Sequence, residues 1–245
     1  MAVVSPRSEV SPLFLTTRWS VVLRAKDCAA SESSSALETL CRDYWYPLYA
    51  YVRRAGHSPP DAQDLTQEFF ARLLAKEWLL AVQPERGRFR TFLIITMKRF
   101  LANEWHRSMT QKRGGAQTHV PLDATDAEQR YACEPALAAD EIYERRWAMT
   151  LLDQTLGALG AEFTAAGRAH DFEYLKCWLT AGRGEIPYAQ LALQMQVSEG
   201  AARVAVHRLR KRFRELFRQQ VQHTLADGED VEAEMRHLVS VLSRA

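Results

Sequence analysis

The sequence has few of the residues that build metal centres, disulfide frameworks or membrane spans. Four cysteines occur in 245 residues, none forms a CxxC pair, and none lies near paired histidines. This scatter supports neither a zinc site nor a disulfide framework, so we expect reduced thiols and no metal or cofactor. No run approaches about 20 continuous apolar residues, and the N-terminus lacks a signal-peptide stretch. The sequence therefore predicts a cytoplasmic protein without a membrane segment.

Catalytic signatures are missing as well. No HExxH, P-loop or calcium-loop spacing occurs in the chain. His223 together with the acidic run 227–230 is the one arrangement that suggests a metal site, and its spacing matches none of these patterns. A protein without enzymatic activity is predicted.

Charge is nearly balanced overall, at +2, but it is segregated along the chain. Basic clusters at 98–113 and 203–218 are offset by acidic stretches at 61–68, 123–144 and 227–234. Partners of both signs are therefore expected.

Almost every patterned segment has the 3.6-residue period of a helix, and no convincing alternating strand is found. The predicted fold class is all-α, with two helical domains joined by a flexible linker. Residues 36–55 form one predicted helix, which Pro47 is expected to kink or split. Further helices are expected at 61–76 and 91–107, and a terminal helix at 231–242. The predicted divisions are an N-terminal extension, a first domain, a linker rich in Gly, Pro and small polar residues, a second domain and a C-terminal tail, at 1–30, 31–113, 114–140, 141–222 and 223–245.

The stretch 187–217 has the pattern of two helices joined by a short turn. Its first helix has one apolar face, formed by Tyr188, Leu191, Ala192 and Met195. Ser198 then caps a second helix, which carries seven Arg or Lys against two Glu between 198 and 219, or 7 − 2 = +5. Such a cationic helix also fits a membrane surface, a calmodulin-like groove or a merely solvated face. The supporting first helix favours a helix-turn-helix that enters the major groove of DNA.

Two earlier segments carry further patterns. In 61–73 the charged side chains lie on one side of a helix, which by itself indicates a solvated face with an i,i+4 Glu68–Arg72 pair. In 89–107 aromatic and basic residues interleave, as on surfaces that stack bases and follow phosphates. For Phe92 and Phe100 a place in the core is the favoured interpretation.

Three stretches, DAQDLTQEFFARL, FRTFLIITMKRFLANEWHR and IPYAQLALQMQVSEGAARVAVHRLRKRFREL, occur in this order. Together they resemble an extracytoplasmic-function (ECF) sigma factor of bacterial RNA polymerase, over most of 36–222. The resemblance implies a first domain that binds core RNA polymerase and melts the minus-ten element, and a second that binds the minus-thirty-five element of promoter DNA. An anti-sigma factor is a further candidate partner. The alternative is a helix-turn-helix regulator that acts without polymerase.

The resemblance and the residue patterns together assign three sets of candidate site residues. The polymerase-binding set is Asp61, Asp64, Leu65, Gln67, Glu68 and Phe69. The minus-ten set is Arg86, Arg88, Phe89, Arg99, Asn103, Trp105, His106 and Arg107. The minus-thirty-five set is Ser198, Glu199, Gly200, Arg203, His207, Arg210, Lys211 and Arg214. The chain departs from the family pattern in having Arg99 where Asn is common, Gln196 where Gly is frequent, and Val204 and Ala205 where Ser and Arg are often found.

Overall fold

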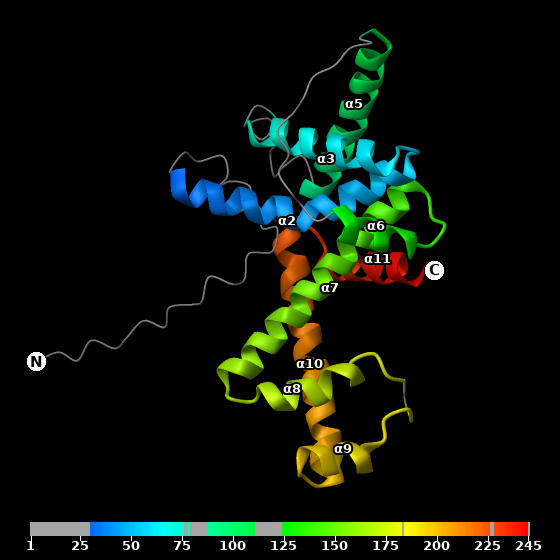
Figure 1. The fold of residues 1–245 in the computed structure, drawn as a ribbon. Helices are drawn as coiled ribbons and strands as arrows, with labels where there is room; N and C mark the ends of the chain where they lie inside the picture. The colour runs from blue at the N-terminus through cyan, green and yellow to red at the C-terminus, as the bar shows by residue number, and fades with distance from the viewer. Residues whose placement is uncertain are drawn as a thin grey trace, which may run out of the picture.

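The helical periods of the sequence are realised as helices throughout the part of the chain that can be described (Figure 1). The computed structural model describes residues 30–75, 78, 88–110, 124–182, 184–225 and 228–244, and of 30–37, 74, 107–110, 124 and 125 the backbone alone. Every regular element within these ranges is a helix. The predicted all-α fold class is confirmed.

Helix α2, Ala30–Arg54, continues through Pro47. Its inner face repeats at three- and four-residue intervals, which places one stripe of side chains against the core. The buried members of this stripe are Leu40, Tyr44, Leu48 and Tyr51. An interior proline costs about 3 kcal/mol because a backbone hydrogen bond is lost, and burial of Tyr44 and Leu48 on either side of Pro47 offsets that cost. Pro47 therefore does not split the helix.

Helix α3, Pro59–Leu74, starts with two prolines, whose missing N–H groups would have no helical partner at this position. The hydroxyl of Ser58 caps the helix by accepting a hydrogen bond from the N–H of Asp61 at 3.4 Å. Helix α5, Phe89–Thr110, packs against α3 and extends beyond it (Figure 1). The buried face of α5 consists of Phe89, Leu93, Met97 and Phe100.

Part of the range predicted as a flexible linker is folded. Helix α6, Ala124–Ala132, lies against α2, because the carboxylate of Glu128 accepts hydrogen bonds from Tyr49 Oη at 2.5 Å and from Arg53 Nη2 at 2.8 Å. The next helix begins at Ala139, within the same predicted range. Residues 124–140 are thus held on the body of the protein, and the first part of the predicted linker lies outside the described residues.

The remaining elements are α7, Ala139–Ala165; α8, Ala169–Leu175; η2, Lys176–Trp178; α9, Tyr188–Met195; α10, Glu199–Thr224; and α11, Val231–Ser243. Together with the earlier helices they enclose two clusters of buried apolar side chains. We call the larger core the cluster formed by α2, α3, α5, α6, the first half of α7, the end of α10, and α11. The smaller core is formed by the second half of α7, α8, α9 and the first part of α10.

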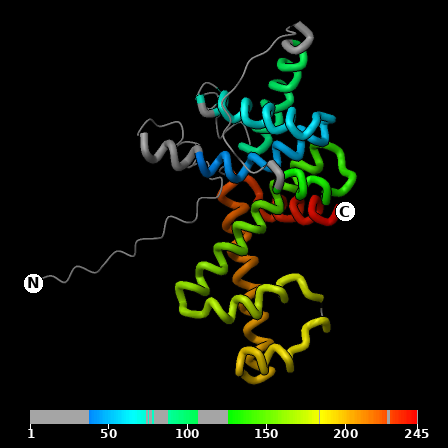
Figure 2. Tube along the Cα trace, in the orientation of Figure 1, coloured from blue at the N-terminus to red at the C-terminus, as the bar shows by residue number. Residues whose placement is uncertain are grey.

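Helices α7 and α10 belong to both cores and lie side by side between them (Figure 2). With a rise of 1.5 Å per residue, the 27 residues of α7 span about 40 Å. Tyr143 and Trp147 of α7 and Phe217 of α10 pack in the larger core with the first predicted domain. The two cores are therefore connected by two continuous helices, and the predicted second domain contributes to both.

The described residues contain no helix long and apolar enough to cross a bilayer. They also contain no group of three His, Cys, Asp or Glu side chains placed to hold a metal ion. Three of the four cysteines are described, and all three are free thiols: Cys41, Cys133 and Cys177.

Candidate polymerase and nucleic-acid interfaces

The outer face of α3 presents the carboxylates that the sequence singled out. Asp61 is exposed, and its carboxylate accepts a hydrogen bond from the Ser58 hydroxyl at 2.6 Å, so it also belongs to the helix cap. Asp64 is exposed, and Leu65 and Gln67 are partly buried. Asp64 is thus the candidate contact on this face whose charge is most open to a partner.

Glu68 takes part in a chain of charges that joins α3 to α5. Its carboxylate contacts Arg72 at 2.8 Å, and Arg72 reaches Glu104 of α5 at 3.0 Å. The Arg72 guanidinium also lies over the ring of Phe100, 5.0 Å from its centroid. The predicted i,i+4 pair therefore exists, and it has a structural role between the two helices.

Phe69 requires a correction. It was predicted to contact the polymerase, but its side chain has no exposed surface and packs in T-shaped or tilted contact with Phe70, Trp78 and Phe100. Phe69 is four residues from both Leu65 and Leu73, and this spacing places it on the inner stripe of α3. Phe69 anchors the helix on the larger core and presents no surface to a partner.

The outer face of α5 gathers four exposed side chains at intervals of four, four and three residues, which is one helix face. These residues are Ile95, Arg99, Asn103 and His106. Trp105 is beside them, 57% exposed, and its ring meets that of His106 edge to face at 5.1 Å. An exposed arginine, an amide and exposed rings on one protruding helix suit contacts to phosphates and unstacked bases. Arg107 lies on the same helix, but its side chain is outside the described residues.

The predicted contacts at the start of α5 are corrected by burial. Phe89 is 3% exposed and meets the ring of Tyr44 edge to face at 5.5 Å, so it is a core residue. Arg88 is partly buried, and its guanidinium pairs with Glu234 at 2.6 Å and Glu229 at 3.4 Å. Arg86 lies outside the described residues. Of this group, Arg88 alone has a described cationic group, and acidic residues near the C-terminus contact it.

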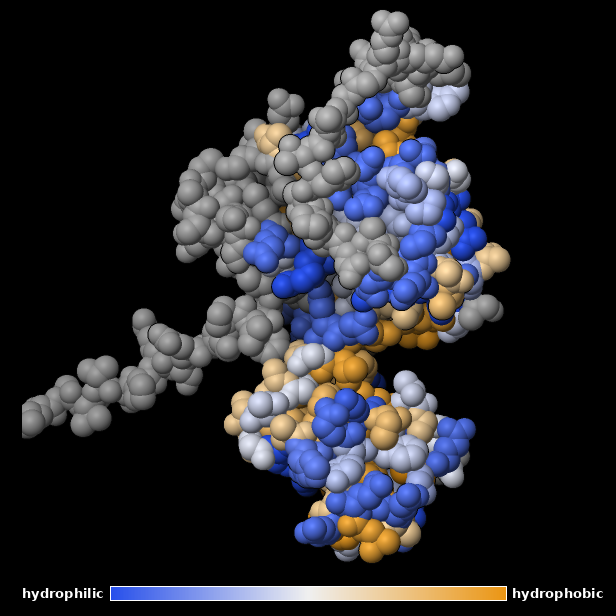
Figure 3. Space-filling model, viewed as in Figure 1, coloured by the Kyte–Doolittle hydropathy of each residue, from blue (hydrophilic) through white to orange (hydrophobic). Residues whose placement is uncertain are grey.

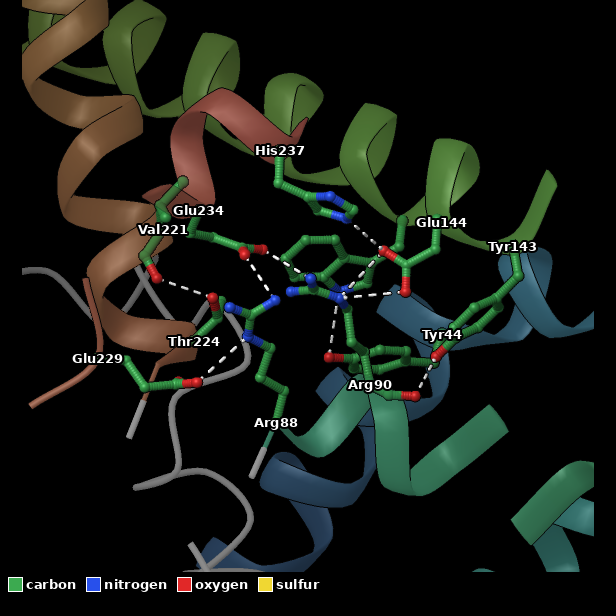
Figure 4. Close-up of polar contacts among 11 residues, drawn as sticks. Tyr44, Arg88, Arg90, Tyr143, Glu144, Val221, Thr224, Glu229, Glu234 and His237 are labelled. Atoms are coloured by element: carbon green, nitrogen blue, oxygen red, sulfur yellow. Dashed lines mark hydrogen bonds and ion pairs between the residues drawn. The ribbon is translucent and has the colours of Figure 1, made fainter. Parts of the chain in front are cut away.

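Arg88 belongs to a buried ionic network that sequence reasoning missed (Figure 4). Its centre is Arg90, 3% exposed, whose guanidinium contacts Glu234 at 2.7 Å and Glu144 at 3.3 Å. The same guanidinium lies 4.2 Å from the ring centroid of Trp147. The backbone carbonyl of Arg90 accepts a hydrogen bond from Tyr143 Oη at 2.9 Å. No local period signals these pairs, because the partners lie on α5, α7 and α11, far apart in sequence.

The turn between α9 and α10 has a defined geometry. Gln196 is in the left-handed region, with φ 55° and ψ 42°, and within the described residues no other non-glycine residue has positive φ. The N–H of Val197 donates to the carbonyl of Ala192 and the N–H of Gln196 to that of Leu193, which is the Schellman pattern. Ser198 then caps α10 by accepting a hydrogen bond from Ala201 N–H at 3.2 Å. The turn is therefore only three residues long, as the sequence predicts.

Helix α10 buries one side and exposes a basic stripe on the other. Ala202, Val206 and Leu209 face the smaller core. The exposed stripe, which we call the basic stripe, consists of Gly200, Arg203, His207, Lys211, Arg214 and Arg218. These residues recur every three or four positions, so they form one continuous surface along the helix.

Arg203 is the most constrained member of the basic stripe. Its guanidinium contacts the Glu199 carboxylate at 2.5 Å and lies 4.4 Å from the ring centroid of Tyr188 on α9. The ion pair is half-exposed, so it contributes little to folding. Glu199, predicted as a DNA contact, is exposed and acts in this structure as the partner of Arg203.

Arg210 requires a correction. It was predicted to contact DNA, but its guanidinium donates hydrogen bonds to the backbone carbonyls of Trp178 and Ala181 at 2.5–3.0 Å. Arg212 also has a structural role, because its guanidinium pairs with Glu162 of α7 at 2.5 Å. The hydrogen bond with Glu162 raises the pKa of Arg212 above its ordinary value. Both arginines fasten α10 to the rest of the smaller core. Because both arginines hold α10 in this orientation, the basic stripe faces outward.

Exposed apolar side chains gather at the end of the molecule that carries α9. Leu193 is 80% exposed, Val197 42% and Val204 47%. Orange, hydrophobic surface is visible at this end in Figure 3. Val204 lies next to Arg203 on α10, so an apolar contact and a cationic contact are available side by side.

Comparison with known families finds one match. Residues 40–110 match the family model described as Sigma-70 region 2. This segment covers less than a third of the 245-residue chain and contains most of α2, all of α3 and all of α5. No significant match was found among curated proteins or among solved structures. The match supports the prediction of a sigma factor that binds core RNA polymerase.

Proposed function

We propose that the chain is a sigma factor of the ECF type, which binds core RNA polymerase and directs promoter-specific initiation of transcription in the cytoplasm. The observation that carries the proposal is the combination, in one chain, of the Sigma-70 region 2 segment with a second, separate surface, the basic stripe of α10. The chain supplies no chemistry; bond formation belongs to the polymerase.

In this proposal the three surfaces divide the work. The outer face of α3 contacts the polymerase through Asp64 and its neighbours. The outer face of α5 contacts the opened minus-ten strand, where exposed bases stack on rings and phosphates meet Arg99. The helix pair α9–α10 acts as a helix-turn-helix, with the start of the basic stripe at base edges and the later residues at phosphates. Several weak contacts then give useful affinity only when the holoenzyme is assembled.

Run-off transcription tests the proposal. Purified chain is added to core RNA polymerase on genomic DNA fragments, and transcripts are mapped with and without it. We expect discrete starts that depend on the added chain. If the chain instead binds duplex DNA tightly without polymerase and stimulates no start, the alternative of a helix-turn-helix regulator is correct.

A further inference from the structure

The acidic segment at the start of α11 contacts arginines at the start of α5 and on α10. Residues 229–234 contain the four carboxylates Glu229, Asp230, Glu232 and Glu234. Glu229 and Glu234 pair with Arg88, Glu234 also pairs with Arg90, and Glu232 pairs with Arg218 of the basic stripe at 2.7 Å. A short run of negative charge thus pairs with three arginines.

Arg88 and Arg90 form a convergent pair. Both guanidinium groups reach the same carboxylate, that of Glu234, at 2.6 and 2.7 Å (Figure 4). The Glu234 side chain has no exposed surface. Two guanidinium groups that converge on one oxyanion make a site that fits a carboxylate or a phosphate equally well.

The pairing is buried, and its hydrogen bonds are incomplete. Neither Glu234 oxygen completes a hydrogen bond, and Arg90 Nη1 also makes none, although all three atoms are buried. The ionic contacts are therefore short but poorly aligned. A buried ion pair also gives little net stability, because desolvation of the charges offsets their attraction. A core that required stability alone would gain as much from apolar residues.

Helix α11 is held by few fully buried side chains. Only Glu234, Leu238 and Val241 of its 13 residues are buried. Gly228, with φ 88°, stands just before the helix, where a residue without a side chain permits a change of direction. Outer contacts such as Arg218–Glu232 are half-exposed and weak.

We propose that the segment 229–243 is an autoinhibitory element, in which Glu229 and Glu234 occupy a phosphate-binding site made by Arg88 and Arg90. The ligand of the open site is the sugar-phosphate backbone of a single DNA strand. Arg88 immediately precedes α5, whose outer face is the candidate minus-ten surface, so the site adjoins the first turn of that helix. This inference rests on the proposed function for the identity of the strand, whereas the competition between segment and strand does not depend on polymerase.

The first experiment measures binding of a fluorescein-labelled single-stranded oligothymidine to the full chain by anisotropy. Glu234→Gln is compared with Asp153→Asn, which removes a charge of the same sign from an exposed position on α7, outside the segment. We expect Glu234→Gln to bind roughly three- to tenfold more tightly than the unmodified chain and Asp153→Asn to change binding little. The salt slope should steepen by about 1 to 1.5 in Glu234→Gln, because each phosphate contact to a single strand adds about 0.7.

Adding Arg88→Ala and Arg90→Ala to Glu234→Gln should return affinity and slope to those of the unmodified chain. Equal affinity and equal slope for Glu234→Gln and Asp153→Asn would overturn the proposal. A second measurement needs no variant, should Glu234→Gln fail to fold. Saturating oligothymidine should increase hydrogen exchange of the amides at 231–243 in the unmodified chain, and unchanged or slower exchange there would overturn the proposal.

Run-off transcription with core polymerase separates this inference from the proposed function. More starts with Glu234→Gln than with Asp153→Asn support both the proposed function and autoinhibition. Equal starts with both variants leave the function standing and overturn autoinhibition. No starts with any variant, together with release of α11 by oligothymidine, overturn the function and leave the site standing.

Discussion

The guanidinium of Arg203 lies over the ring of Tyr188, 4.4 Å from its centroid, and so links the two helices on either side of the turn. The contact holds the first exposed arginine of α10 in one orientation before any DNA is bound. A preorganised side chain loses less entropy on binding, which favours a role in reading bases over a role in diffuse attraction.

Arg203→Ala and Lys211→Ala should therefore have different effects. Loss of Arg203 should cost about 1–3 kcal/mol of DNA-binding free energy and relax base preference at one or two minus-thirty-five positions. Loss of Lys211, which is exposed and lies two helical turns further along the same face, should weaken binding to all sequences alike and reduce the salt slope by about one unit. Selection from randomised promoters with the holoenzyme distinguishes the two. An unchanged minus-thirty-five preference for Arg203→Ala would show that this residue does not read bases.

Asp64→Lys should weaken binding to core polymerase roughly five- to tenfold without unfolding the chain. Asp64 is exposed, so its charge contributes little to folding. Asp153→Lys is the matched control, because Asp153 is an exposed carboxylate on α7, away from α3. Pull-down affinities for the two variants, with circular dichroism as the folding check, test the assignment. Equal affinities would remove Asp64 from the polymerase surface.

Arg99→Ala should lower open-complex formation more than initial binding of the holoenzyme to the promoter. Arg99 belongs to the outer face of α5, whereas its neighbour Lys98 pairs with Asp140 at 2.7 Å and points to α7. Lys98→Ala is thus the control from the same helix. Permanganate footprints report the unpaired thymines. Footprints as strong for Arg99→Ala as for the unmodified chain would contradict the prediction.

Gln196→Gly should raise the free energy of unfolding by about 0.5–1 kcal/mol. A non-glycine residue in the left-handed region is strained by about 1–2 kcal/mol, and the greater freedom of glycine in the unfolded chain returns about 0.4–1 kcal/mol of this gain. Gln194→Gly, at an exposed position inside α9, should instead lower stability by about 1 kcal/mol. Urea denaturation of both variants gives the comparison, and a loss of stability in Gln196→Gly would mean that its side chain makes a compensating contact.

Asp43→Asn should stabilise the fold at neutral pH and have little effect near pH 4. Burial raises the pKa of the Asp43 carboxyl to about 6, against a hydrogen bond from Gln154 and the charge of Arg42, which lower it. Because the pKa is raised in the folded state, the stability that the Asp43 carboxyl contributes is fully present below its unfolded pKa of about 3.9. That contribution is lost as the pH rises through about 6. At pH 7.5 the Asn variant should be more stable by roughly 2 kcal/mol. Urea melts at pH 4 and 7.5 test this, and an identical difference at both values would rule out titration of Asp43.

Much of the fold was predictable because amphipathic periods are local. The stripe through Leu65 and Leu73 located α3, and Ser198 marked the start of α10. The same periods placed Phe69 among buried residues, and its assignment to a polymerase surface came from position in a motif alone. Phe89 is similar, because an aromatic residue between two arginines looks like a base-stacking side chain until the packing around it is known.

The long-range pairings could not be predicted from the sequence. Arg90 and Glu234 are separated by most of the chain, and nothing in the spacing of either reveals the other. Arg210 is likewise one of several basic residues in a row, and only the position of the Trp178 and Ala181 carbonyls distinguishes it from Lys211. Charge runs indicate which surfaces are basic, while tertiary contacts decide which charges are free to bind.

Helices α7 and α10 each supply side chains to both cores, and this sharing has a consequence for cooperativity. Melting the smaller core frees one end of two helices whose other ends remain packed, and melting the larger core does the same in reverse. Each half therefore stabilises the other, so the described part of the chain has the architecture of one cooperative folding unit. A cut between α7 and α10 would separate sequence segments that complete each other's interior, and neither fragment would retain a closed core.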